Sequence, residues 1–131
     1  MSDPVHPRVF KSAWFAKAAR KAKITDAALC KAIEQVIKGQ ADDLGGGVYK
    51  KRLSSNQYRS IVLARGGAWW VYEFLFAKQD RANIEDDELK AFRLLAKSYA
   101  SLSGEQVAAL VEGKDWIEIC KDRDFWEPEN G

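Results

Sequence analysis

The chain has 131 residues, of which 47% are hydrophobic and 31% charged, and its formal net charge is +2. This length and composition are typical of one globular domain that buries a core without help from a metal or a disulfide. No run of about 18 apolar residues is present, which excludes a membrane-spanning helix, and residues 1–7 lack the apolar segment of a signal peptide. We therefore expect a cytoplasmic protein with a single domain over residues 1–131, a core over about residues 9–120, and loose tails at 1–7 and 121–131.

The cysteine and histidine content limits the possible chemistry. Cys30 and Cys120 are far apart and form no C-x-x-C pair, so we expect two inert buried thiols and no disulfide. His6 is the only histidine and precedes the first predicted element, which excludes histidine acid–base pairs, Ser-His triads and His-ligated metals. The four acidic residues at 85–88 complement a helix dipole and do not predict a metal site. The sequence indicates no metal and no small-molecule cofactor.

Charge is distributed unevenly along the chain. Residues 44–84 carry seven Lys/Arg and two Asp/Glu, a balance of +5, whereas residues 85–131 carry six basic and twelve acidic residues, a balance of −6. A basic segment beside an acidic one suggests a polyanion site on one side of the molecule. Solvated charges scattered over a mixed surface are an equally common explanation of such a pattern.

Apolar residues at helical spacing predict four helices. These cover residues 13–22, a segment from the N-cap Thr25 to Gly39, residues 85–99, and a segment behind the capping box of Ser103 and Gln106 that ends at Gly113. We expect the first two helices to form a hairpin that packs against a sheet.

Aromatic and β-branched runs separated by turn residues predict an antiparallel meander of residues 48–53, 58–63 and 69–77. Residues 9–10 form a possible short edge strand, residues 45–47 a flexible lead, and residues 116–120 a final strand. The fold class is thus α+β: an N-terminal helical hairpin packed on a twisted antiparallel β-sheet, followed by further C-terminal helices and a final strand.

The turns of the meander predict its register. A four-residue loop at residues 54–57 places Arg52 opposite Arg59, and a two-residue turn at Gly66-Gly67 would place Arg59 opposite Phe74 and Leu63 opposite Trp70. One face would then carry a row of cations and aromatic rings, namely Lys50, Arg52, Arg59, Lys78, Tyr72, Phe74 and Phe76. Two arginines opposite each other repel unless an anion or a carboxylate lies between them, which suggests a phosphate site. Glu73 is expected on the opposite face, in a structural role.

Basic side chains interleaved with aromatic ones can hold an RNA backbone and stack its bases. The candidates are Lys50, Lys51, Arg52, Arg59, Lys78 and Arg81, with Tyr49 and Tyr58 among them. Cations alone can also support cleavage, because arginines neutralise a phosphorane and a lysine crowded by like charges can act as a base. Taken without a template, solvated strand and loop residues remain the slightly favoured interpretation.

Three segments in order resemble the RelE/HigB-like toxins of bacterial type II toxin–antitoxin systems, within the RelE/ParE superfamily. After Trp14-Phe15 and its basic helix, these segments are Asp43–Arg52 (DLGGGVYKKR), Tyr58–Val62 (YRSIV) and Phe76–Ile84 (FAKQDRANI). The resemblance runs from about Phe10 to about Cys120. It implies a RelE-like α+β fold and an endoribonuclease of messenger RNA that acts in the ribosomal A site. Its partners would be a cognate antitoxin, mRNA and ribosomal RNA, with no membrane involved.

The resemblance also implies which residues form the site. The family's catalytic positions fall on Lys50, Lys51, Arg52, Arg59 and Arg81, and its RNA-binding surface on Tyr49, Tyr58, Lys78 and Asn83. Residues 50–52 would help to activate the 2′-hydroxyl and hold ribosomal RNA, and Arg59 and Arg81 would stabilise the phosphorane.

The sequence departs from the family pattern at two places. The tyrosine that some ribosome-dependent members carry shortly after the position of Arg81 has no counterpart in Asn83-Ile84-Glu85, and the loop between Arg52 and Tyr58 is shorter than usual. Two other functions therefore remain open: a non-enzymatic ParE-like toxin that binds gyrase, and an RNA-binding module without catalytic activity.

Overall fold

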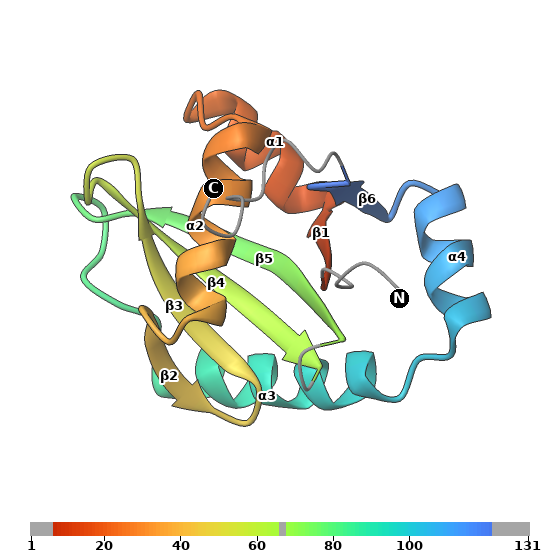
Figure 1. The fold of residues 1–131 in the computed structure, drawn as a ribbon. Coiled ribbons are helices and arrows are strands. Elements are labelled where there is room, and N and C mark those ends of the chain that lie inside the picture. Colours follow the sequence, from red (N-terminus) through yellow and green to blue (C-terminus); the bar gives the residue numbers. More distant parts are fainter. Residues whose placement is uncertain (1–6, 66–67, 122–131) are drawn as a thin grey trace.

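The computed structural model describes residues 7–65 and 68–121. Within these residues the strands are β1 (Arg8–Ser12), β2 (Asp42–Gly45), β3 (Val48–Leu53), β4 (Tyr58–Arg65), β5 (Trp69–Ala77) and β6 (Trp116–Ile119), and the helices are α1 (Ala13–Lys21), α2 (Asp26–Ile37), α3 (Asp86–Ala100) and α4 (Gly104–Glu112). The strands form one sheet in the order β2-β3-β4-β5-β1-β6 (Figure 1). The α+β class is confirmed. The tails predicted at residues 1–7 and 121–131 lie almost wholly outside the described residues, as does the turn at Gly66-Gly67.

The predicted pairing of β3 with β4 is confirmed. Arg52 lies opposite Arg59 and Leu53 opposite Tyr58, with residues 54–57 as the connecting loop. Three consecutive loop residues, Ser54, Ser55 and Asn56, have positive φ angles of 53°, 53° and 72°. Side chains other than glycine rarely adopt this conformation, so the loop is held in place by its surroundings.

The predicted pairing of β4 with β5 is wrong by a shift in register. Arg59 lies opposite Phe76 and Leu63 opposite Val71, and the register changes between Ile61 and Val62. The shift leaves Glu73 between two paired residues of β5, as a β-bulge does, and so alternation along the strand is interrupted there. As a result, one aromatic ring is misplaced by the predicted register: the sequence places Tyr72 on the same face as Arg59.

Tyr72 instead lies in the core on the other side of the sheet, where its hydroxyl donates a 2.7 Å hydrogen bond to the carbonyl of Leu29 in α2. Burial raises the pKa of its phenol well above the ordinary value. The carboxylate of Glu73 accepts a 2.9 Å hydrogen bond from the hydroxyl of Tyr99 in α3. Because α3 covers the Arg59 face, the expectation that Glu73 points away from this face is wrong.

The edges of the sheet also differ from expectation. β1 is an inner strand, parallel to β5 and antiparallel to β6, because Val9 and Phe10 are both fully buried and need cover on both faces. Residues 42–45 form the edge strand β2, which turns into β3 through Gly46 and Gly47 at φ angles of 64° and 83°. The segment expected as a flexible lead is thus a hairpin. The central position of β5 is confirmed.

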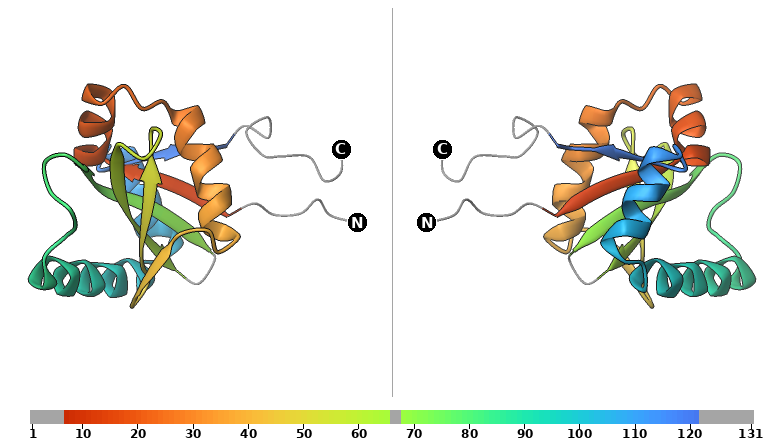
Figure 2. Two further views of the ribbon diagram at one scale, coloured as in Figure 1. Left: turned by 90° about the vertical axis from the view of Figure 1, so that its left-hand side faces the viewer. Right: turned by 90° about the vertical axis from the view of Figure 1, so that its right-hand side faces the viewer.

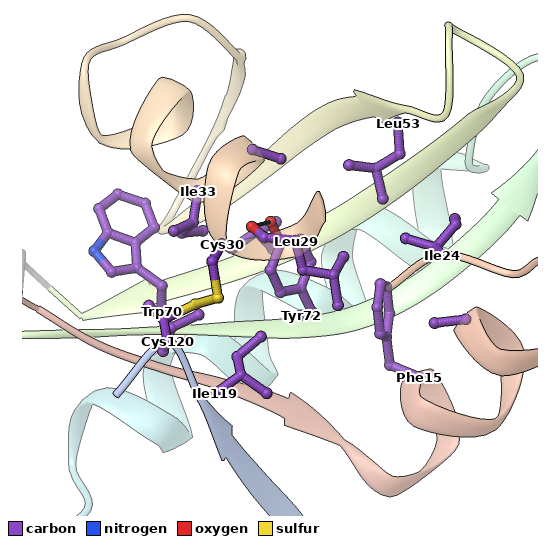
Figure 3. Close-up of a cluster of buried hydrophobic side chains, with 14 of the residues drawn as sticks. Phe15, Ile24, Leu29, Cys30, Ile33, Leu53, Trp70, Tyr72, Ile119 and Cys120 are labelled. Atoms are coloured by element: carbon purple, nitrogen blue, oxygen red, sulfur yellow. Dashed lines mark hydrogen bonds between the residues drawn. A yellow bond between two sulfur atoms is a disulfide. The ribbon is translucent and has the colours of Figure 1, made fainter. Parts of the chain in front are cut away.

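Helices α1 and α2 contribute to one apolar core on the side of the sheet that buries Tyr72. Their N-caps are Ser12, which accepts a hydrogen bond from the amide of Phe15, and the predicted Thr25, which accepts one from Ala28. α1 packs against β5 and α2 against β3, and each helix contacts the sheet directly. The core includes Phe15, Ile24, Leu29, Ile33, Trp70 and Tyr72 (Figure 3).

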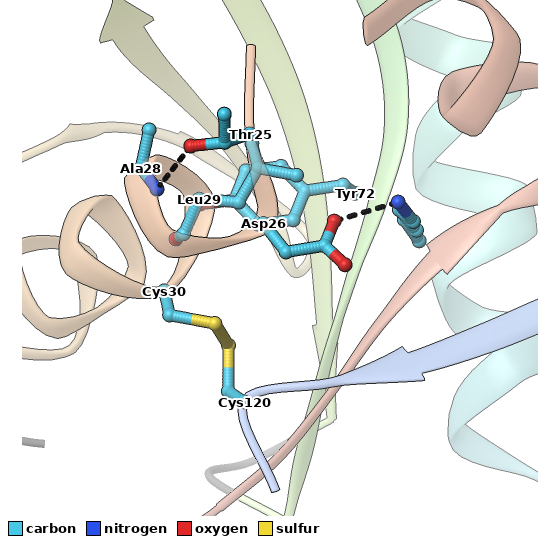
Figure 4. The surroundings of a disulfide bond; sticks show 8 residues. Thr25, Asp26, Ala28, Leu29, Cys30, Tyr72 and Cys120 are labelled. Atoms are coloured by element: carbon cyan, nitrogen blue, oxygen red, sulfur yellow. Dashed lines mark hydrogen bonds and ion pairs between the residues drawn. A yellow bond between two sulfur atoms is a disulfide. The ribbon is translucent and has the colours of Figure 1, made fainter. Parts of the chain in front are cut away.

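Cys30 of α2 and Cys120, directly after β6, form a disulfide within this core (Figure 4). The expectation of two free thiols is wrong, although both residues are buried as predicted. The Cα atoms lie 5.5 Å apart, inside the range that a disulfide can bridge, although 90 positions separate them in sequence. The bond ties the end of an edge strand to the helix that covers the sheet.

Helices α3 and α4 cover the opposite face, and both begin with a capping box, at Glu85 with Glu88 and at the predicted Ser103 with Gln106. α3 packs on Val48, Ile61, Leu63 and Phe76 of the sheet. In the part of the chain that the structure describes, no helix is long and apolar enough to cross a membrane.

A pH effect on stability follows from Glu73. Burial raises the pKa of its carboxyl, and the hydrogen bond from Tyr99 opposes part of that rise. Since the folded chain then holds the proton more tightly than the unfolded chain, the free energy of unfolding decreases as the pH rises from the ordinary glutamate range through the folded-state pKa. We expect Glu73→Gln to gain about 1 kcal/mol or less at pH 7, because partial exposure screens the charge, and to match the wild type near pH 4. Thermal melts at both pH values test this, and a variant that is less stable at pH 7 would contradict it.

Candidate functional site

The cationic face is the part of the sheet that lies near the 54–57 loop, on the side of α3. We define it by Lys50, Arg52, Arg59, Arg81 and Asn83. Arg52 and Arg59 face each other across β3 and β4, and Phe76 of β5 lies opposite Arg59. In the left view of Figure 2, the loop from β5 to α3 runs down the left-hand edge of the molecule to the start of α3. That loop carries Arg81 and Asn83.

Arg59 is the most buried cation of this face, with 8% of its surface exposed. Its Nη1 donates hydrogen bonds of 2.8 Å to the carbonyl of Asn56 and 3.4 Å to that of Tyr58, so the guanidinium holds the loop between β3 and β4. Among the described residues, no carboxylate pairs with it, and its Nε and Nη2 atoms have no hydrogen-bond partner. These two atoms are not among the fully buried unpaired atoms of the described chain, so they remain open to solvent and to an anion. Arg52, directly opposite, is exposed.

Arg81 is held by its own loop and by α3. Its guanidinium forms an ion pair with the carboxylate of Glu88, in which Nη1 lies 3.2 Å from Oε2, and its Nε donates a 3.0 Å hydrogen bond to the carbonyl of Asn83. The guanidinium carbon lies 5.5 Å from the ring centroid of Phe76. The ion pair raises the pKa of Arg81 and lowers that of Glu88. Arg81 is therefore fixed over the ring that lies opposite Arg59.

Lys50 connects β3 to the same loop. Its Nζ donates a 3.3 Å hydrogen bond to Oδ1 of Asn83 and lies 3.7 Å from the carboxylate of Asp42 in β2. Asn83 therefore contacts both Lys50, through its side chain, and Arg81, through its carbonyl. Four cations and one amide form a continuous group on one face.

The remaining predicted site residues lie elsewhere. Lys51 points to the other side of β3, where its Nζ donates a 3.3 Å hydrogen bond to the carbonyl of Gln40, and burial together with the nearby charge of Arg52 lowers its pKa. The partly buried ring of Tyr49 packs against the core, 5.4 Å from the ring of Trp70, on the side of the sheet opposite the cationic face. Tyr58 also packs against the core, and with Lys78 it lines a hollow of about 490 Å³ at the tip of the sheet.

Two acidic partners were missed by the reasoning from sequence. Glu88 was expected only as a dipole-complementing residue of the helix, and Asp42 lies in a strand that was not predicted. Neither pairing has a local sequence signal, because Arg81 and Glu88 are seven positions apart across a loop and a helix start. Among the described residues, no group of three or more His, Cys, Asp or Glu side chains could hold a metal ion.

The fold and this face define a class of small α+β proteins in which a sheet presents clustered arginine and lysine side chains between flanking helices. The chain belongs to the RelE toxin family: the model of the family described as the RelE toxin of the RelE / RelB toxin-antitoxin system matches residues 7–119. Membership implies an antitoxin as its partner. The searches of curated proteins and of solved structures found no match.

Proposed function

We propose that this toxin is a metal-independent endoribonuclease that cleaves messenger RNA in the ribosome. The observation that supports the proposal is Arg59, a nearly buried guanidinium whose Nε and Nη2 atoms have no partner in the described chain and which faces Arg52 across the ladder. Such a pair suits a phosphodiester, because arginine binds phosphate oxygens with two parallel hydrogen bonds.

The cleavage step assigns roles to the cationic face. The 2′-oxygen loses its proton, attacks the adjacent phosphorus and forms a phosphorane. The bond from phosphorus to the 5′-oxygen then breaks, and this oxygen takes a proton from solvent water, which leaves a 2′,3′-cyclic phosphate and a 5′-hydroxyl. We assign proton removal to Lys50, the lysine that shares a face with Arg59, and charge neutralisation of the phosphorane to Arg59 and Arg81. Arg52 would hold the backbone of the mRNA, and Lys51, which points to the other side of β3, would contact ribosomal RNA. Lys50 and Arg81 would exchange the carboxylates of Asp42 and Glu88 for phosphate oxygens when RNA binds.

The ion pair of Arg81 with Glu88 favours one alternative, an RNA-binding module without activity. If the carboxylate stays in place, two of the four cations of the face remain paired, since Lys50 also has Asp42. Such a protein would bind RNA with a steep salt dependence and cut nothing.

Induced expression in a bacterial host, followed by primer extension on the host messenger RNAs, tests the proposal. We expect growth arrest with discrete in-frame cuts that disappear in the Arg59→Ala/Arg81→Ala double variant. Arg20→Ala, which removes an exposed cation at the end of α1, is the matched control and should cut as the wild type does. Arrest with intact transcripts would instead indicate a gyrase-binding toxin, and no arrest would indicate the inactive module.

A further inference from the structure

Trp14 is a large apolar side chain that the fold leaves exposed. It lies in the first turn of α1, and 51% of its surface is accessible. One face of its indole stacks on Phe74 of β5, with centroids 4.9 Å apart and planes at 20°. Packing against Phe74 therefore covers only one face of the indole and leaves the other face open.

The position of Trp14 is set by the start of its helix. Ser12 caps α1 through the amide of Phe15 at 3.0 Å, and its hydroxyl also lies 3.4 Å from the carbonyl of Glu73 in β5. The first turn of the helix is thereby anchored directly beside Phe74. A rigidly placed ring loses little conformational freedom when a second ring stacks on it.

A row of aromatic rings joins Trp14 to the cationic face. The centroid of Phe74 lies 6.1 Å from that of Phe76, and the guanidinium of Arg81 lies over Phe76. Phe76 is in turn the residue opposite Arg59. Trp14 is therefore the exposed end of a row whose other end carries the two arginines that we assign to the phosphorane.

We propose that the free face of Trp14 stacks on a nucleobase of the bound single-stranded RNA, at a position next to the cleaved phosphodiester. This inference rests on the proposed function. A binding surface for single-stranded RNA combines cations that follow the backbone with aromatic rings on which bases stack. The cationic face supplies the cations, whereas Tyr49 and Tyr58, the rings interleaved with them in sequence, are partly buried and pack against the core on the other side of the sheet. Trp14 supplies the missing ring.

Binding of the full-length chain to ribosomes programmed with uncleavable mRNA tests this. Methylation of the 2′-oxygens in the A-site codon prevents cleavage, and a parallel set of mRNAs carries an abasic nucleotide at each codon position in turn. We expect Trp14→Ala to weaken binding about 5- to 150-fold, the range of losing one stacked base. At one codon position the abasic mRNA should weaken wild-type binding by a similar factor, with no further loss in Trp14→Ala.

Three variants complete the design. Trp14→Phe keeps a ring and should bind within about threefold of the wild type. Leu94→Ala is the matched control: it removes an apolar side chain of α3 that is 64% exposed, and it should bind as the wild type does. A loss in Trp14→Ala that is the same for every abasic mRNA, no loss at all, or a loss confined to antitoxin binding would overturn the inference. Cleavage of unmodified mRNA separates this failure from failure of the proposed function: if the wild type cleaves and Arg59→Ala does not, only the inference on Trp14 fails, whereas a wild type that binds ribosomes without cleaving overturns the proposed function.

Discussion

Replacing Arg59 with alanine is expected to lower the rate of mRNA cleavage about 100- to 1,000-fold, the typical effect of removing one donor that stabilises a developing oxyanion. The reason is its position: Arg59 is 8% exposed, and two of its three guanidinium nitrogens have no partner in the described chain. Hydrogen bonds to a phosphorane are strongest where water is excluded. Single-turnover cleavage on programmed ribosomes measures this rate constant directly.

Arg59→Lys distinguishes charge from geometry. It keeps one positive charge but cannot form the two parallel hydrogen bonds of a guanidinium or hold the carbonyl of Asn56 in the same way, so we expect at least a 10-fold loss. Thermal melts of both variants control for the hydrogen bonds that Arg59 makes to the loop. Cleavage by Arg59→Ala at the wild-type rate, in a variant that remains folded, would remove Arg59 from the catalytic site.

Features of the fold that depend on residues close together in sequence were predicted correctly. The four-residue loop after Leu53 determined the pairing of Arg52 with Arg59, because loop length sets the register of a hairpin. The N-cap Thr25 and the capping box at Ser103 were also predictable, since a capping side chain bonds to an amide only three residues away. The β3–β4 hairpin carries three of the five residues of the cationic face, namely Lys50, Arg52 and Arg59.

The errors concern features without a local signal. A β-bulge can use an ordinary strand residue such as Glu73, so the shift that moves Tyr72 into the core could not be read from residue types. The parallel pairing of β1 with β5 joins segments about sixty positions apart. β2 contains Asp42 and Asp43, which are poor strand formers, and it is held by pairing with β3.

The sequence predicted which basic residues form the site, but it did not predict the acidic and aromatic side chains that they contact. Alternation along β3 distinguishes Lys50 and Arg52 from Lys51, but the resemblance to the family treated all three as one cluster. The carboxylates of Asp42 and Glu88 and the aromatic contact of Trp14 depend on how distant elements meet. Such contacts decide which cations are already neutralised, and hence which of them are open to RNA.

Reducing the disulfide is expected to have a large effect on stability. Closing a loop of 90 positions between Cys30 and Cys120 restricts the unfolded chain by about 4.6 kcal/mol in the chain-entropy description. We therefore expect the reduced protein to lose about 4–5 kcal/mol in its free energy of unfolding, and about 15 °C in Tm for a domain of this size. Urea denaturation with and without a thiol reductant measures the difference, and in a reducing environment the chain would lack this contribution.

A double variant, Cys30→Ala/Cys120→Ala, separates the effect of losing the disulfide from any other effect of the reductant on stability. Alanine suits these positions because both cysteines are buried, and a serine hydroxyl would need a hydrogen-bond partner there. The variant should unfold at the urea concentration of the reduced wild type and should not respond to reductant. Thiol titration of the urea-unfolded, unreduced wild type should find no free thiol. Two titratable thiols, or equal stability with and without reductant, would mean that the bond does not form in solution and that packing alone holds the end of β6 on α2.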